Sequence, residues 1–227
     1  MAGTQSMRRA WDRRAEEDAL VAIEASRRDW TDDEFFADGR AMVEEAMAWI
    51  GDGVRRGRML EIGCGVGRTA VPFAHHFEQV EGVDISPRMV DAAVARGLPP
   101  NVHLQATSGT ALAPFEDRSL DFLFSEHVFQ HIADASVIER YLAEIARVLG
   151  PNGAALLQFD TRRANPGSWL QNVLPDRLLP RKRRRHMRRY RRDPAWLSRA
   201  AAQAGLRVEW ERGERSHWHW FMLRSAG

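Results

Sequence analysis

Residues 59–68 read Met-Leu-Glu-Ile-Gly-Cys-Gly-Val-Gly-Arg, and this stretch decides the fold. Apolar residues lead into Glu61, and glycines then follow at every second position, which predicts a buried strand that turns sharply into a helix. Glycines in such a turn allow positive φ and carry no Cβ, so a ligand can lie directly against the backbone. The stretch does not read as a phosphate clamp. Arg68 replaces the last glycine of a dinucleotide fingerprint, and no Gly-Lys-Ser/Thr ending follows.

A second strand-like run covers residues 79–85 and contains Asp84, seventeen residues after Gly67. This spacing fits one helix and a return strand, so a right-handed βαβ unit would put the Asp84 carboxylate beside the glycine turn. A carboxylate there can accept hydrogen bonds from both hydroxyls of a ribose, and we therefore predict a nucleoside-like ligand. The alternative is that Asp84 caps the helix that begins after Ser86 and Pro87.

Two later motifs extend the pattern. Residues 119–125 read Ser-Leu-Asp-Phe-Leu-Phe-Ser, typical of a buried strand, and residues 148–153 read Val-Leu-Gly-Pro-Asn-Gly, typical of the turn before another strand. With the glycine turn and Asp84, they follow the motif order of the class I S-adenosylmethionine-dependent methyltransferases, which the chain resembles from about residue 59 to residue 160. The resemblance implies a Rossmann-like fold and S-adenosyl-L-methionine as the cofactor.

In that family the first acidic residue and the glycine turn hold the methionine half of the cofactor, and the acid after strand two holds the ribose. Many relatives also carry an acid after strand three for the adenine amino group, whereas residues 105–110 here read Gln-Ala-Thr-Ser-Gly-Thr. Hydroxyls or backbone in this stretch are candidates for the adenine contact, and a plain polar turn is the alternative. The predicted cofactor residues are Trp11, Glu61, Gly63, Cys64, Gly65, Gly67, Arg68, Asp84, Ile85, Met89, Ser108, Gly109, Thr110 and Ser125.

The order of predicted elements favours an α/β fold with a doubly wound, mostly parallel, seven-stranded sheet. Residues 7–23 and 33–50 carry apolar side chains at helical spacing, so residues 1–52 would form an N-terminal helical cap and residues 53–227 the methyltransferase domain. Strands two to five are predicted at 79–85, 102–105, 120–125 and 154–159, and a final hairpin at 206–211 and 217–223.

Residues 161–193 interrupt this alternation, because the stretch is too long for an ordinary connection. We predict a helical lid over the acceptor, with Trp169 against the substrate; a protrusion used for dimer contacts is the alternative. Residues 181–192 contain nine Lys or Arg. This run either pairs with the acidic remainder of the chain or meets an anionic substrate, an anionic membrane surface or nucleic acid. Tyr190 is its only aromatic residue, which argues against a nucleic-acid groove.

Residues 125–131 read Ser-Glu-His-Val-Phe-Gln-His and follow the predicted fourth strand, beside the expected sulfonium. Methyl transfer requires an aligned acceptor, removal of its proton and exclusion of water. His127 is the first choice for the base, with Glu126 and His131 as further catalytic candidates. The alternative is that His127 only shapes the pocket and His131 packs the loop.

Residues 217–220 read His-Trp-His-Trp, and on a strand both histidines would point the same way. We predict that His217 and His219 help to form a wall for a planar substrate; packing of an edge strand on a helix is the alternative. No metal site is predicted, because carboxylate-rich metal loops are not evident.

Together these features predict methyl transfer to an oxygen or nitrogen of a small-molecule acceptor, such as a quinone or a natural product. The alternatives are an RNA or protein methyltransferase that uses the arginine-rich segment, and a regulatory module that binds the cofactor without catalysis. Cys64 is the only cysteine, which excludes an intrachain disulfide. Without an apolar membrane span or a signal-peptide core, the chain is expected to be cytoplasmic, as a monomer or a homodimer.

Overall fold

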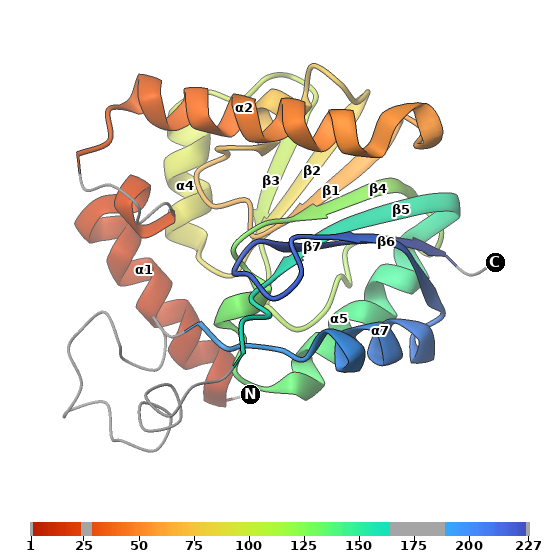
Figure 1. Cartoon of the computed structure of the whole chain (residues 1–227). Helices are drawn as coiled ribbons and strands as arrows, with labels where there is room; N and C mark the ends of the chain where they lie inside the picture. Colours follow the sequence, from red (N-terminus) through yellow and green to blue (C-terminus); the bar gives the residue numbers. More distant parts are fainter. Residues whose placement is uncertain (1, 24–28, 164–188, 226–227) are drawn as a thin grey trace.

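The computed structural model describes residues 2–23, 29–163 and 189–225, and its centre is one seven-stranded sheet with the strand order β3-β2-β1-β4-β5-β7-β6 (Figure 1). Strands β3, β2, β1, β4 and β5 run parallel, and β7 pairs antiparallel with both β5 and β6. The predicted doubly wound, mostly parallel sheet is therefore confirmed. The strands are β1 (Arg58–Ile62), β2 (Gln79–Asp84), β3 (Val102–Ala106), β4 (Leu120–Ser125), β5 (Leu149–Phe159), β6 (Leu206–Arg212) and β7 (His219–Ser225).

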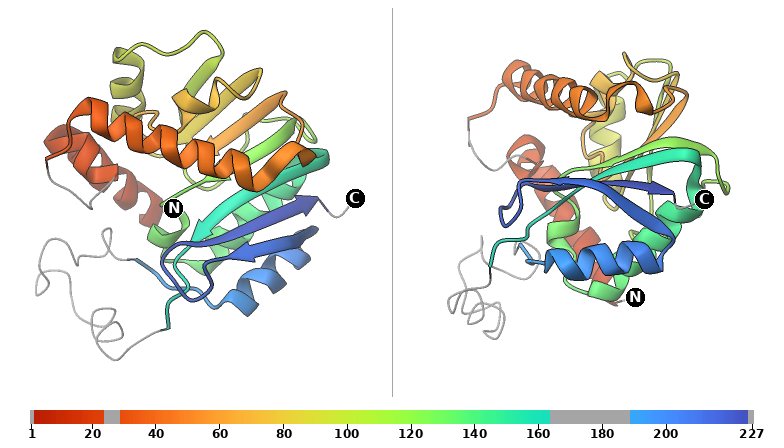
Figure 2. Two further views of the ribbon diagram at one scale, coloured as in Figure 1. Left: turned by 45° about the horizontal axis from the view of Figure 1, so that its top comes forward. Right: turned by 45° about the vertical axis from the view of Figure 1, so that its right-hand side comes forward.

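Helices cover both faces of the sheet. Helix α2 crosses one face, and α5 and α7 lie against the other, as the two further views in Figure 2 also show. The helices are α1 (Ala2–Ile23), α2 (Asp32–Ile50), α3 (Ala70–Phe73), α4 (Pro87–Ala95), α5 (Ala135–Val148) and α7 (Pro194–Gln203), with short 3-10 turns η1 (Gly51–Gly53) and η2 (Phe129–His131). Among the helices that the structure describes, none has the length and apolar character needed to cross a bilayer.

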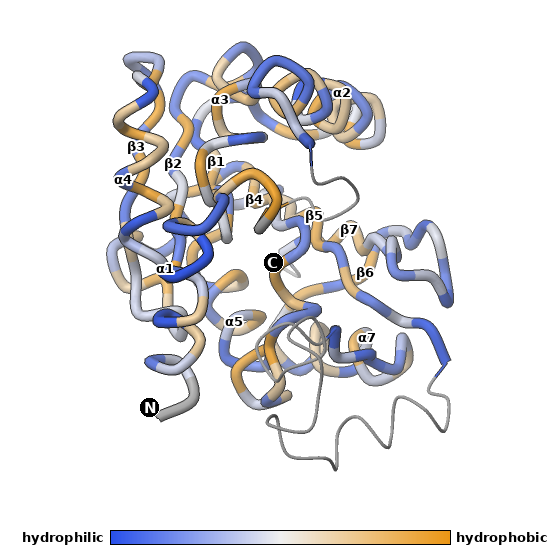
Figure 3. Tube along the Cα trace, turned by 90° about the vertical axis from the view of Figure 1, so that its left-hand side faces the viewer, coloured by the Kyte–Doolittle hydropathy of each residue, from blue (hydrophilic) through white to orange (hydrophobic). Residues whose placement is uncertain are grey.

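Alternation along the strands builds a core on each face. On β1, Met59 belongs to the same buried cluster as Val43 of α2, whereas the next residue, Leu60, belongs to a cluster with Leu142 of α5. Successive side chains of a strand point to opposite faces, so a strand buried on both sides must be apolar at nearly every position. In Figure 3, where hydrophobic residues are orange, orange segments mark the central strands.

The two N-terminal helices have different positions. Helix α2 begins at Asp32, one residue before the expected range of 33–50, after a capping box between Thr31 and Glu34. Its apolar face shares a core with the sheet. Helix α1 lies against α4, where the Ser86 hydroxyl donates to the Asp12 carboxylate at 2.6 Å. Its backbone leaves helical geometry at Asp18, whose side chain accepts hydrogen bonds from the next turn. The domain boundary at residue 52 stays a prediction.

Several sequence expectations fall on residues 164–188, which lie outside the described residues. They include Trp169, most of the predicted lid and the first part of the arginine run. The end of the predicted segment, residues 189–193, is described. The Tyr190 N–H donates to the Gln130 carbonyl at 2.6 Å, and the Arg192 N–H donates to the Asp160 carbonyl at 2.8 Å. The end of the segment therefore runs beside η2 and the end of β5.

Candidate active site

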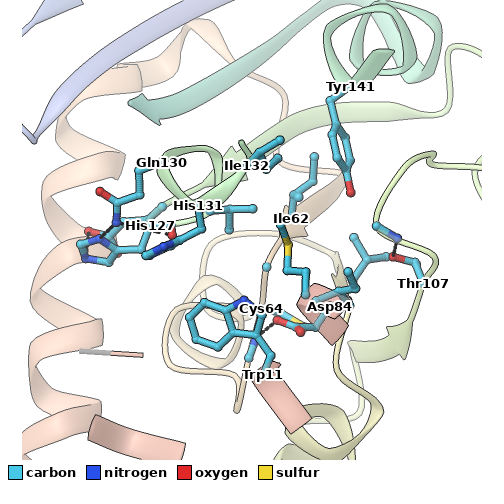
Figure 4. A pocket seen from close by; sticks show the side chains of 18 of the residues that line it. Trp11, Ile62, Cys64, Asp84, Thr107, His127, Gln130, His131, Ile132 and Tyr141 are labelled. Carbon is cyan, nitrogen blue, oxygen red and sulfur yellow. Dashed lines mark hydrogen bonds and ion pairs between the residues drawn. The ribbon is translucent and has the colours of Figure 1, made fainter. Parts of the chain in front are cut away.

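The carboxyl ends of β1, β2, β3 and β4 meet at one edge of the sheet and open into a cavity of about 580 Å³ (Figure 4). Helix α1 and residues 189–190 contribute to its walls. Parallel strands bring their carboxyl ends to the same edge, which is where open α/β sheets bind ligands. The volume suits a small organic ligand.

The glycine turn after β1 forms part of the cavity. Gly63 and Gly65 have φ of +81° and +50°, and a Cβ on Gly63 would lie 2.0 Å from a methyl carbon of Val128. The Gly63 N–H donates to the Val83 carbonyl at 2.7 Å, which ties the turn to β2. Gly67 does not line the cavity; its N–H donates to the Cys64 carbonyl at 2.8 Å and closes the turn from behind.

Glu61 lies at the cavity and is 4% exposed. One carboxylate oxygen accepts a hydrogen bond from the Thr69 hydroxyl, and the other is buried without a hydrogen-bond partner among the described residues. Burial raises the pKa of Glu61 to about 8. A buried carboxylate oxygen that lacks a partner suits a cationic ligand group, and the α-ammonium of S-adenosylmethionine is such a group. The site therefore fits the cofactor that the sequence implies.

Asp84 closes β2 and also lines the cavity. Its carboxylate accepts hydrogen bonds from the Gly65 N–H at 3.0 Å and the Ser86 N–H at 2.8 Å. Burial outweighs these bonds and raises its pKa to about 6. Helix α4 is capped by Ser86, whose hydroxyl oxygen accepts from the Met89 N–H, so Asp84 is not the cap proposed as the alternative. Its position beside the turn fits a ribose.

The other predicted cofactor residues divide into two groups. Cys64, Arg68, Ile85, Met89, Gly109 and Thr110 line the cavity. Ser125 does not, because it is fully buried and its hydroxyl donates to the Ile62 carbonyl at 3.0 Å, tying β4 to β1. Ser108 is also absent from the wall, and its hydroxyl lies 3.0 Å from that of Thr110. Burial raises the pKa of the Cys64 thiol, which keeps it protonated and unreactive.

Trp11 reaches the cavity from α1. Its ring meets the ring of His131 edge to face, with centroids 5.5 Å apart, and the guanidinium of Arg14 lies 4.6 Å from the indole centroid. The structure thus brings together an aromatic residue from the first helix and a histidine from η2, more than a hundred positions later. This contact encloses the cavity beside the glycine turn.

One catalytic candidate, Glu126, belongs to a buried ion pair. The guanidinium of Arg68 contacts the Glu126 carboxylate and also Asp38 of α2, the latter at 2.7 Å. Both Arg68 and Glu126 are nearly inaccessible. Because its carboxylate is already engaged by the guanidinium of Arg68, Glu126 is better suited to fixing the wall than to contacting an acceptor.

His127 follows directly, with φ of +61°, a backbone conformation that is uncommon for residues other than glycine. Its backbone N–H donates to the Gln158 side chain at 2.9 Å, which holds this turn. The Nδ1 atom lies 3.1 Å from the Gln130 side-chain nitrogen (Figure 4). The Nε2 atom lies 3.8 Å from the Glu126 carboxylate. Trp218 closes the far side, with ring centroids 4.7 Å apart. The imidazole is thus held from several directions while it lines the cavity.

The prediction for His217 and His219 is wrong in its geometry. Strand β7 begins only at His219, so His217 lies in the preceding turn and the alternation expected for a strand does not apply. His219 is fully buried, 2.9 Å from the Thr161 hydroxyl and 3.1 Å from the Glu211 carboxylate. Neither histidine lines the cavity, and Trp218 is the residue of this motif that reaches His127.

Sequence reasoning missed several residues that line the cavity. They include Tyr141 and Arg140 of α5, Arg14 of α1, and Tyr190. The signal for Tyr141 was a hydroxyl on the apolar stripe of a strongly amphipathic helix, where the other buried positions are mainly aliphatic. Among the described residues, no group of three His, Cys, Asp or Glu side chains could hold a metal ion.

Comparisons with known proteins agree with this geometry. A family model described as a methyltransferase domain matches residues 60–157. An uncharacterised methyltransferase-like protein of Schizosaccharomyces pombe is 33% identical over 146 residues, which cover 64% of this chain and 48% of that protein. The ubiquinone biosynthesis O-methyltransferase of Bordetella avium is 28% identical, with 88% of this chain and 83% of that protein covered.

Solved structures show the same fold. The magnesium protoporphyrin IX methyltransferase of Synechocystis, with bound S-adenosylhomocysteine, has a TM-score of 0.65 at 17% identity, with 97% of both chains covered.

The chain spans less than half the length of five curated relatives, from 34% to 48%. Because motif order, sheet topology and these relatives agree, residues 60–157 form a methyltransferase domain similar to those of the class I S-adenosylmethionine-dependent family.

Proposed function

We propose that this protein transfers a methyl group from S-adenosylmethionine to an oxygen or nitrogen of a small-molecule acceptor. The observation that carries the proposal is the convergence of two carboxylates on one cavity, Glu61 without a partner for one oxygen and Asp84 at the glycine turn. Glu61 would hold the α-ammonium of the methionine half, Asp84 the ribose hydroxyls, and Gly63 and Gly65 would let the ligand lie against the backbone.

The bound cofactor supplies an electrophilic methyl group on a cationic sulfur. The chain's own residues must then align the acceptor, take up its proton and exclude water. Trp11 and His131 enclose the cavity, and His127 is the group proposed to take up the proton. An amide can offer an oxygen or an N–H, so rotation of the Gln130 side chain could hold a proton on Nδ1 of His127 and so favour the tautomer without a proton on Nε2.

The charge of the cavity points to an acceptor with an anionic group. Arg14, Arg140 and Arg189 line it, from α1, α5 and the return of the long segment. Asp134 lines it too, and its carboxylate offsets one of these three guanidinium groups. With Glu61 and Asp84 assigned to the cofactor and Glu126 paired with Arg68, the remaining charge is positive. A carboxylate or phosphate on the acceptor would complement it.

The relatives support a small acceptor. Ubiquinone biosynthesis and magnesium protoporphyrin IX methylation, named for two of them, both concern small molecules. An acceptor held inside a cavity beside the cofactor is also shielded from water, which would otherwise compete for the methyl group. A macromolecular acceptor would instead have to present a side chain or base to this cavity.

The proposal is tested with methyl-labelled S-adenosylmethionine and pairs of phenols and amines, each as a carboxylate and as its neutral amide. We expect label transfer to the carboxylate members, lost when S-adenosylhomocysteine is added in excess. Binding of S-adenosylhomocysteine without label transfer to any acceptor, including metabolite extracts, would favour the regulatory module. Salt-sensitive transfer to RNA would favour the macromolecular alternative.

A further inference from the structure

We infer that the hydroxyl of Tyr141 hydrogen-bonds the 6-amino group of the cofactor's adenine, in place of the acid that many relatives carry after strand three. The inference rests on the proposed use of S-adenosylmethionine. It assigns a specificity-determining contact to a residue of α5, a helix that lies on one face of the sheet rather than in the cofactor loops.

Tyr141 is a buried polar side chain that faces the cavity. It is 4% exposed and lines the cavity, and its ring packs edge to face on Phe129 with centroids 5.7 Å apart. On the same stripe of α5, Ile138, Leu142 and Ile145 are buried in the core. The Tyr141 hydroxyl makes no hydrogen bond to any residue that the structure describes. The hydroxyl is open to the cavity, so a ligand bound there can supply its hydrogen-bond partner.

The side of the cavity to which this hydroxyl points is the nucleoside side. Figure 4 shows Tyr141 directed toward Thr107 and Asp84, whereas His127 and Gln130 lie on the opposite side. The Thr107 N–H donates to the Asp84 carbonyl at 2.8 Å, which fixes the end of β3 beside the end of β2. With the ribose at Asp84, the base extends toward the wall that Thr107 helps to form.

The hydroxyls that the sequence suggested for this contact are used locally. The Ser108 hydroxyl pairs with that of Thr110 at 3.0 Å, and Ser108 does not line the cavity. The Thr107 hydroxyl oxygen accepts the Gly109 N–H at 3.4 Å. Gly109 has φ of +74°, and a Cβ there would lie 2.6 Å from the Ile85 side chain, so this loop packs closely against Ile85. The base edge therefore needs an acceptor from another element, and Tyr141 supplies one.

The chemistry is a single neutral hydrogen bond. The adenine amino group donates, and a phenolic oxygen can accept while its own proton stays available to a ring nitrogen or water. Burial and the charge of Asp84 raise the pKa of Tyr141, so the phenol stays neutral at physiological pH. No bond is made or broken in this contact; it orients the nucleoside.

The test compares two ligands and three proteins by calorimetry. The ligands are S-adenosylhomocysteine and its analogue that lacks the 6-amino group, and the proteins are wild type, Tyr141→Phe and Tyr190→Phe. Tyr190 is the only other tyrosine of the chain and also lines the cavity, which makes it the matched control. Loss of one neutral hydrogen bond corresponds to about threefold to tenfold in affinity.

Wild type and Tyr190→Phe should both bind S-adenosylhomocysteine about threefold to tenfold more tightly than the analogue, and Tyr141→Phe should bind the two alike. The same ratio in Tyr141→Phe as in wild type would overturn this inference alone. Failure of wild type to bind S-adenosylhomocysteine at all would instead overturn the proposed function. Thermal unfolding of each protein checks the fold, and Tyr141→Phe should not unfold at a lower temperature, because the removed hydroxyl has no protein partner among the described residues.

Discussion

The pKa of Glu61 predicts how cofactor affinity depends on pH. Burial raises it to about 8, so at pH 6 the carboxylate is almost fully protonated in the free protein. Pairing with the cofactor's ammonium requires the charged carboxylate. Binding at low pH must therefore expel a proton, and affinity for S-adenosylhomocysteine should rise between pH 6 and pH 8.

The size of the effect follows from the pKa. At pH 6, two units below this pKa, ionising the Glu61 carboxyl group costs about 2.7 kcal/mol. At pH 8 half of the protein already has Glu61 ionised. Affinity at pH 6 should therefore be about 50-fold lower than at pH 8. At pH 7 binding should release about 0.9 proton if the bound carboxylate stays ionised. Asp84, with a pKa of about 6, adds a further loss below pH 6.

Calorimetry in buffers of different ionisation enthalpy measures the affinity and the proton release together. The control is Glu61→Gln, which keeps an oxygen for the Thr69 hydroxyl but has no charge to gain or lose. Its affinity should be lower at pH 8 and nearly flat from pH 6 to pH 8. A flat wild-type profile, or an equally steep one in Glu61→Gln, would refute the assignment of the ammonium to Glu61.

The same shift predicts a stability effect of opposite sign. The folded pKa lies above the unfolded value, so the free protein binds this proton more tightly when folded. Without ligand, the contribution of Glu61 to the free energy of unfolding is therefore fully present below about pH 4.5 and is lost as pH rises toward 8.

Three further predictions concern single residues. Asp84→Ala should weaken binding of S-adenosylhomocysteine by about 1.5 to 3 kcal/mol, the value of hydrogen bonds to a charged group; unchanged affinity in calorimetry would argue against the ribose contact. His127→Ala should lower turnover far more than cofactor affinity, and equal turnover in both proteins would remove His127 as the base. Gly63→Ala should destabilise the fold more than Gly97→Ala in urea unfolding. Both glycines have positive φ, but only at Gly63 does the new Cβ meet Val128, and equal losses would show that the turn can relax.

Much of the fold was predictable from residues that act locally. Buried strands of a parallel sheet are apolar at almost every position, so β1, β2 and β4 stood out, and the glycine turn and Ser86 marked where helices follow. The hairpin was predicted less accurately. Strand β7 starts two residues later than predicted, because His217 and Trp218 belong to a turn in which the Trp218 N–H donates to the Ser216 hydroxyl at 2.9 Å.

The walls of the site were less predictable, because they depend on contacts between distant residues. Arg68 and Glu126 are 58 positions apart, yet they form one buried ion pair. His219 was predicted to form part of a wall for a planar substrate and is instead enclosed by Thr161 and Glu211. Tyr141 lies on the apolar stripe of α5, yet it turns a hydroxyl toward the cavity. Helical or strand periodicity indicates which face is buried but not which polar atom meets an open space.

The sequence by itself determined the glycine turn and the acid beside it. Both depend only on local backbone preference and on the handedness of one βαβ unit. The tertiary structure decided the remainder: which histidines face the cavity, which carboxylate is paired, and how far burial shifts each pKa. Those properties depend on dielectric environment and on neighbours across the fold, and no local stretch of chain encodes them.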